Sequence, residues 1–200
     1  AARLAPKNYL SWNNLGNVYN AIGDLDKGLE SYWQAHRVNP QAPGPFSNII
    51  TTYHYHPEKT GKEITALCKK WESKFLSSVT ALPLSNLNDP QKRLRVGLIS
   101  DGFRGHPVGR MITSALEHVS KSQIAFYFYS TNNASDGITE RLKSVAEQWM
   151  SVQPLKDQQV AEQIVNDGID ILIDLAGHNA GNRVLAVSMQ PAPVQVKWVG

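Results

Sequence analysis

Residues 94–110 read LRVGLISDGFRGHPVGR, and this stretch decides the fold of the C-terminal part of the chain. Its opening run, Leu94 to Ser100, is mostly apolar and rich in branched side chains, which is typical of a buried strand. A glycine-rich turn follows, and glycine permits tight backbone turns. Pro107 then suits the first position of a helix, where its missing N–H needs no partner. The stretch therefore predicts a strand, a tight turn and a helix.

The same succession recurs further along the chain, where apolar runs alternate with segments of helical composition. The further strand-like runs are 124–129, 169–175 and 193–199, and the helical segments are 108–119, 136–148 and 157–167. Nearly continuous apolar strands separated by helices indicate a parallel sheet covered on both faces. We expect residues 93–200 to form a Rossmann-like, doubly wound α/β lobe that binds ligands beyond the carboxyl ends of its strands.

The N-terminal part has a helical period instead. It matches the tetratricopeptide pattern, in which each repeat of about 34 residues folds into two antiparallel helices. The matching residues are Trp12, Leu15, Gly16, Tyr19, Gly23, Asp24, Tyr32, Ala35 and Pro40. At the small residue Gly16, the second helix can approach the first closely. We expect residues 1–42 to be the end of a tetratricopeptide array, with residues 1–6 finishing an earlier repeat.

Two more helices are expected in residues 43–78, one ending near His56 and one from about Lys62 to Phe75. The second has an apolar face at helical spacing that would cap the repeats. Its members are Ile64, Leu67, Cys68, Trp71 and Phe75. Residues 79–92, with LPLSNLNDP, show turn residues and no sustained period, so we place the connection between the domains there.

Composition excludes several classes of protein. With 42% hydrophobic and 18% charged residues, the chain has enough apolar side chains for a core. Its net charge of +3 comes from interleaved positive and negative residues, so we expect no nucleic-acid partner. A single cysteine fits a reducing compartment, and no signal peptide or membrane-spanning run is recognisable, so we expect a cytoplasmic protein without a membrane partner. The chain lacks an initial Met and stops just after a strand-like segment, so we expect both ends to be cut.

His106 is the first candidate for chemistry, because it precedes a predicted helix at the carboxyl end of a strand. A neutral imidazole there can take a proton from a hydroxyl, and the positive end of the helix dipole favours its neutral form. The alternative is structural, since the same side chain can cap the helix. The residues alone leave both interpretations open.

The second candidate segment, AGHNAGNR, follows the strand that ends at Leu175. Its glycines and amides can expose backbone N–H groups to an anion or a sugar, and His178 can face His106 across the crevice. An ordinary polar loop between a strand and a helix would look the same. Asp174, at the end of the strand, can orient this loop or simply cap a turn.

Other familiar sites fail on spacing. The glycines at 102, 105 and 109 do not form the G-x-G-x-x-G fingerprint of dinucleotide binding, and no phosphate-binding P-loop motif occurs. His54 and His56 are two residues apart and would point to different faces of a helix, so we expect no metal site. We therefore expect the chain to need no cofactor.

Three segments together resemble the start of the catalytic region of O-linked N-acetylglucosamine transferases, especially bacterial and Spindly-like members. They are RLRVGLISDGFRGHPVGRM, GIDILIDLAGHNAGNR and QPAPVQVKWVG. Tetratricopeptide repeats lead into that region in the same family, so the resemblance covers essentially the whole chain. It implies the N-terminal lobe of a GT-B glycosyltransferase. Such enzymes move a sugar from a nucleotide donor, here UDP-GlcNAc, to Ser or Thr of proteins, inverting the anomeric centre without a metal.

The resemblance also assigns roles to residues. His106 matches the His of the family's H-P motif, to which a catalytic-base role has been given, and Pro107 completes that motif. Gly177, His178 and Asn179 match a loop that lines the acceptor and sugar side, although animal members carry Tyr and Thr at the last two positions. The family's nucleotide-binding lobe lies C-terminal of the residue that matches Gly200. The resemblance therefore implies protein acceptors recruited through the repeats and a donor bound mainly by a lobe outside this chain, and we expect the chain alone to be inactive.

Two alternatives remain open at this stage. The chain can be a tetratricopeptide interaction module whose α/β lobe is only a scaffold, in which case peptide binding would survive removal of residues after about 92. The same fold can also use GDP-fucose, as in Spindly-type members. Neither the acceptor proteins nor the oligomeric state follows from the sequence.

Overall fold

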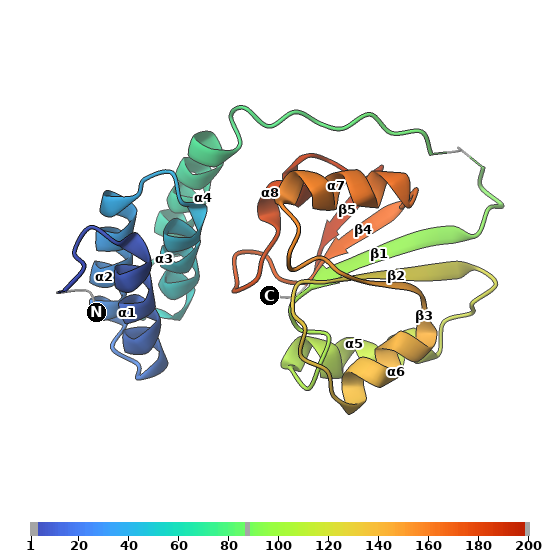
Figure 1. Ribbon diagram of the computed structural model, residues 1–200, viewed down its shortest axis with the longest axis horizontal. Coiled ribbons are helices and arrows are strands. Elements are labelled where there is room, and N and C mark those ends of the chain that lie inside the picture. The colour runs from blue at the N-terminus through green and yellow to red at the C-terminus, as the bar shows by residue number, and fades with distance from the viewer. Residues whose placement is uncertain (1–3, 87–88, 199–200) are drawn as a thin grey trace. The chain divides into compact units, whose positions relative to one another are not determined.

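The computed structural model describes residues 4–86 and 89–198, which form helices and one five-stranded sheet (Figure 1). The chain divides into two compact units, residues 1–78 and residues 79–200. Of the expected segments, residues 1–3, 87–88 and 199–200 lie outside the described residues. No helix within the described part of the chain is long and apolar enough to cross a bilayer.

The N-terminal unit consists of helices, most of which begin at a capping side chain. They are α1 (Tyr9–Ala21), α2 (Leu25–Val38), α3 (Pro43–Tyr55) and α4 (Gly61–Phe75). The side chains of Asn8 and Asp24 accept backbone N–H groups at the starts of α1 and α2, and Thr60 forms a capping box with Glu63 at the start of α4. The helices expected near 43–56 and 62–75 are thus confirmed.

Close packing of α1 on α2 depends on Gly16. A Cβ atom at this position would lie 2.5 Å from ring atoms of Tyr32, whose hydroxyl donates to the Asn17 side chain at 2.9 Å. Tyr32 and Ala35 are fully buried. The expected close approach at Gly16 is confirmed, because no larger residue fits without moving the tyrosine.

The C-terminal unit is built on a sheet in which every strand is parallel to its neighbours (Figure 1). The strands are β1 (Leu94–Ser100), β2 (Ile124–Ser130), β3 (Ala146–Ser151), β4 (Ile171–Asp174) and β5 (Val194–Lys197), in the order β3-β2-β1-β4-β5. The connecting helices are α5 (Pro107–Glu117), α6 (Gly137–Val145), α7 (Asp157–Asn166) and α8 (Val184–Ser188).

Two hydrophobic cores cover the two faces of this sheet. Leu98 belongs to the core that includes Ile112 of α5 and Leu142 of α6. The next residue, Ile99, points to the opposite core, which includes Ile164 of α7 and Ala186 of α8. Because successive strand residues face opposite sides, apolar runs such as LRVGLIS supply both cores. The expected doubly wound parallel sheet is confirmed.

The predicted helix over 136–148 is wrong at its C-terminal end. Helix α6 stops at Val145, and residues 146–151, AEQWMS, form strand β3. The strand pairs with β2, and Trp149 stacks on Phe128 with ring centroids 5.2 Å apart. Tertiary pairing therefore overrides a local sequence that carries no glycine or proline to end the helix. Strand β4 is also shorter than the predicted 169–175, and α8 was not predicted.

The expected connection, residues 79–92, contains no helix or strand among its described residues and lies against the lobe. The Leu82 N–H donates to the Met189 carbonyl at 2.8 Å, and Leu82 packs on the lobe's core. Farther along, the Asn86 side chain donates to the Asp170 carboxylate at 2.8 Å. This segment is therefore fastened to the sheet.

Candidate functional site

The sheet has a topological switch point between β1 and β4. From β1 the chain proceeds through α5 to β2, whereas β4 leads through α8 to β5 on the other side. Ile99 of β1 pairs with Asp174 of β4, so the loops that follow these strands leave the same edge of the sheet as neighbours. In open α/β sheets this is the place where ligands bind.

The β1–α5 loop, residues 101–106, is fixed at three points. Phe103 is 2% exposed and packs edge-on against Phe128, with ring centroids 5.1 Å apart. The Phe103 carbonyl accepts the Thr139 hydroxyl at 2.8 Å, and the Gly105 N–H donates to the Asp136 carboxylate at 2.5 Å. That bond from Gly105, followed by further backbone N–H groups, holds the pKa of Asp136 below its ordinary value. The loop is thus tied to the start of α6.

Two glycines let this loop fold onto the first turn of α5. A Cβ at Gly109 would lie 2.2 Å from the Arg104 carbonyl oxygen and 2.6 Å from the Gly102 carbonyl oxygen. A Cβ at Gly102 would lie 2.8 Å from Nδ1 of His106. The position of His106 therefore depends on the absence of side chains at both positions.

His106 is the N-cap residue of α5, so the helix-capping role left open by the sequence is confirmed. Its Nδ1 accepts the N–H of Val108 at 3.3 Å, and the side chain is partly exposed. Because a backbone N–H can only donate, Nδ1 must carry a lone pair, and a neutral ring then bears its proton on Nε2. In this arrangement Nε2 is a hydrogen-bond donor. Pro107 occupies the first helical position and is exposed.

The β4–α8 loop, residues 175–183, presents the other sequence-predicted residues. Asp174 is 8% exposed, and its carboxylate accepts the N–H of Ala176 at 2.9 Å and of Gly177 at 3.1 Å. Gly177 has a φ of 57°, which glycine adopts without strain. His178 and Asn179 follow and are partly exposed. Asp174 therefore caps the turn that follows β4, which is one of the two roles left open by the sequence, and through this cap it fixes the start of the loop.

The β4–α8 loop also contacts the loops after β1, β2 and β3. A Cβ at Gly181, whose φ is 70°, would lie 3.0 Å from both Asp101 Cβ and Thr131 Oγ1. Arg183 donates to the Val152 carbonyl at 2.8 Å and to other acceptors of the β3–α7 loop. The sequence marked AGHNAGNR as a unit but gave no sign of these partners, which come from distant segments. Their only common signal is a position directly after a strand.

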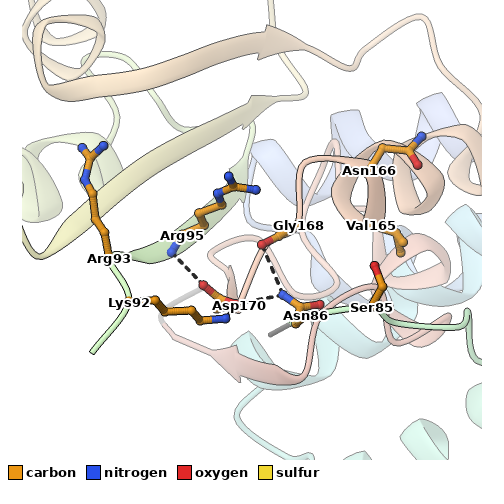
Figure 2. A pocket seen from close by; sticks show the side chains of 9 residues that line it. All are labelled: Ser85, Asn86, Lys92, Arg93, Arg95, Val165, Asn166, Gly168 and Asp170. Carbon is orange, nitrogen blue, oxygen red and sulfur yellow. Dashed lines mark hydrogen bonds and ion pairs between the residues drawn. The ribbon is translucent and has the colours of Figure 1, made fainter. Parts of the chain in front are cut away.

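A second feature lies at the opposite, amino-terminal edge of the sheet (Figure 2). It is a cavity of about 380 Å³ where the connecting segment passes β1 and β4. Its charged groups are engaged: Asp170 accepts Lys92 Nζ at 2.6 Å, Arg95 donates to the Asp167 carbonyl, and Arg93 pairs with Glu147. Burial alone would raise the pKa of Asp170, but hydrogen bonds from the Arg95 N–H, Lys92 and Asn86 hold it below the ordinary value. Through Lys92 and Asn86, these contacts attach the connecting segment to the sheet.

No group of three or more His, Cys, Asp or Glu side chains is placed to hold a metal ion within residues 4–86 and 89–198. The loops at the carboxyl edge carry hydrogen-bonding side chains instead: the His106 and His178 rings, the Asn179 amide and the Asp101 carboxylate. Such groups suit a ligand rich in hydroxyls.

Comparison with known proteins gives a consistent family. Residues 65–200 match the family model described as glycosyl transferase family 41. The chain is 26% identical over 169 residues to the probable UDP-N-acetylglucosamine–peptide N-acetylglucosaminyltransferase SPINDLY of Arabidopsis thaliana. It is 33% identical over 110 residues to SEC, a protein of the same description from that plant. These matches cover 82% and 54% of this chain but only 18% and 11% of the relatives.

A solved structure, a mutant of the Thermobaculum terrenum O-GlcNAc transferase, superposes with a TM-score of 0.92 at 33% identity. The match covers 99% of this chain and 38% of that chain. The chain therefore spans well under half the length of the proteins that it resembles.

Proposed function

Because this chain belongs to glycosyl transferase family 41, we propose that it is the acceptor-side part of a protein O-glycosyltransferase. The proposed reaction transfers N-acetylglucosamine from UDP-GlcNAc to Ser or Thr hydroxyls, with inversion and without a metal. The proposal rests on the pair of loops at the switch point: one follows β1 and carries His106, and the other follows the neighbouring strand β4 and carries the Gly177–Asn179 segment. The nucleotide part of the donor would bind mainly to a further lobe.

His106 is the proposed catalytic residue. In an inverting transfer the acceptor oxygen attacks the anomeric carbon, the bond to the diphosphate breaks, and the hydroxyl proton leaves. While Val108 donates to Nδ1, the Nε2–H of a neutral His106 can orient an oxygen of the substrates by donating to it. Accepting the hydroxyl proton at Nε2 requires the ring to carry its proton on Nδ1, and this breaks the cap. The geometry thus supports an orienting role more directly than the base role implied by the family resemblance.

Pro107, Gly177, His178 and Asn179 are the proposed substrate-binding residues. Pro107 begins α5 beside His106, and the other three follow β4 across the switch point. The N–H groups of Gly177 and Asn179 donate to the Asp174 carboxylate and the Ala176 carbonyl. We therefore assign the contact with sugar hydroxyls to the partly exposed side chains of His178 and Asn179.

The helical unit is the proposed acceptor-recruiting part. We assign residues 1–42 to the end of a tetratricopeptide array, 43–78 to its cap, 79–92 to the connection and 93–200 to the N-terminal lobe of a GT-B enzyme. The helical hairpin α1–α2 with its glycine contact at Tyr32 supports this assignment. The protein acceptors and a cytoplasmic location follow from the same proposal.

The test is a transfer assay with the complete gene product and an acceptor protein from its own cell. Mass spectrometry should find one N-acetylhexosamine on Ser or Thr when UDP-GlcNAc is supplied, and the yield should be unchanged by EDTA. Attachment of a deoxyhexose from GDP-fucose instead would identify the other donor. Absence of transfer from both donors to any acceptor would refute the enzymatic proposal and favour an interaction module.

A further inference from the structure

Arg183 stands out among the partly buried charged groups of the lobe because its guanidinium donates to several acceptors between β3 and the first residue of α7. Its side chain is 15% exposed. One terminal nitrogen donates to the Leu155 carbonyl at 3.0 Å and to the Asp157 carboxylate at 3.2 Å. The other donates to the Val152 carbonyl at 2.8 Å and to the Gln153 carbonyl at 3.1 Å. The guanidinium thus binds four acceptors: three carbonyls of the β3–α7 loop and the carboxylate of Asp157, the first residue of α7.

Only arginine suits this set of acceptors. A guanidinium is planar and presents five N–H donors in a fixed fork, whereas a lysine ammonium is a flexible point charge with three donors. A partly buried acceptor left without its donor is costly, and this applies to the Leu155 carbonyl and the Asp157 carboxylate. The three carbonyls and the Asp157 carboxylate therefore favour one orientation of Arg183, and with it one position of the backbone at residue 183.

Arg183 is also the last residue of the loop that carries His178 and Asn179. At the start of this loop, Asp174 binds the backbone of Ala176 and Gly177. Between the two ends, the Asn182 side chain donates to the Asn179 carbonyl at 2.8 Å. The loop is thus held at both ends and braced across its turn, so that His178 and Asn179 lie between fixed points.

We propose that Arg183 is a positioning residue for sugar transfer: it binds the β3–α7 loop and so fixes the 177–182 segment against the bound substrates. This inference rests on the proposed function of that segment. Its physical basis is that a displacement of about 1 Å in a group that orients substrate can lower the rate by about 100-fold. Arg183 itself touches neither substrate in this account.

The test compares Arg183→Lys, Arg183→Ala and Arg141→Ala in the complete gene product. Arg141 of α6 is the matched control. It donates two hydrogen bonds to Glu117, the last residue of α5, at 2.8 and 2.6 Å, and it is not part of the loops at the switch point. We expect Arg183→Lys to lower kcat/KM for the acceptor by about 10- to 100-fold. Guanidinium at millimolar concentration should restore part of the activity of Arg183→Ala and have no effect on Arg141→Ala.

Hydrogen exchange supplies a readout that does not depend on catalysis. In Arg183→Lys the amides of residues 176–182 should exchange faster, while those of α5 and β1 keep their protection. Wild-type exchange in that segment, or wild-type kcat/KM in Arg183→Lys, would overturn the proposal. If the wild-type protein transfers no sugar at all, the proposed function fails, and the exchange result still decides whether Arg183 fixes the loop.

Discussion

Replacing Gly109 by alanine should damage the site without touching any proposed substrate-binding side chain. The new Cβ would lie 2.2 Å from the Arg104 carbonyl oxygen, whereas ordinary contact begins near 3.4 Å. The clashing atoms, the carbonyl oxygens of Arg104 and Gly102, belong to the backbone. The 102–106 turn therefore has to move away from α5 by about 1 Å. His106 is the last residue of this turn and moves with it.

Two magnitudes follow from this displacement. Overpacking of this kind costs about 1–3 kcal/mol of folding free energy. A shift of about 1 Å in an orienting group lowers kcat/KM by about 100-fold, so activity should fall far more than stability explains. The assay is the initial rate of sugar transfer by the complete gene product, measured well below the melting temperature of Gly109→Ala.

Gly137 provides the matched control for this variant. It is the first residue of α6 in the same lobe, and a Cβ there meets no atom within 4 Å. Gly137→Ala should therefore keep its activity and lose no stability. Normal turnover in Gly109→Ala would refute the reasoning, because it would mean that the turn can move without disturbing the site.

Three further predictions concern stability. Asp170→Ala should lower the free energy of unfolding by about 3 kcal/mol, because it removes a nearly buried carboxylate that accepts Lys92 at 2.6 Å and two further donors. Hydrogen exchange of the core amides of β1 measures this loss, and a loss below about 1 kcal/mol would contradict the prediction. Since the pKa of Asp170 is lowered in the folded state, its contribution is present above the unfolded value near 3.8 and is lost as the pH falls through the folded value. The stability gap between wild type and Asp170→Asn should therefore shrink below about pH 4. In the helical unit, Gly16→Ala should lower the free energy of unfolding by about 1–3 kcal/mol, because the new Cβ meets the Tyr32 ring. Gly44→Ala is the control and should lose no stability, because a Cβ there meets no atom within 4 Å. Equal melting temperatures of the two variants would disprove the close approach at Gly16.

The parts of the fold that the sequence predicted are those with local signals. Strand β1 and the start of α5 were predicted because an apolar run, glycines and Pro107 lie next to one another. Strand β3 was missed because AEQWMS becomes a strand only by pairing with β2 and stacking Trp149 on Phe128. Local propensity cannot express a contact of that kind.

The same division applies to the site. His106 and the Gly177–Asn179 segment were found because they directly follow strands, which is where parallel sheets bind ligands. Gly109, Gly181 and Arg183 were not assigned roles. The importance of Gly181 and Arg183 lies in partners far away in sequence, such as Thr131 and Val152, and that of Gly109 in how the 102–106 turn folds back onto α5. The spacing of residues in the sequence does not reveal such contacts.

The most direct measurement of the central claim is sugar transfer by His106→Asn in the complete gene product. Asparagine is a strong N-cap residue, so this variant can keep the bond to the Val108 N–H while losing the imidazole Nε2. His106→Ala removes both and reports the cost of the cap. We predict that His106→Asn folds like the wild type, with unchanged exchange in α5, and loses nearly all transfer. Wild-type turnover in folded His106→Asn would contradict the assignment of the catalytic site to this edge of the sheet.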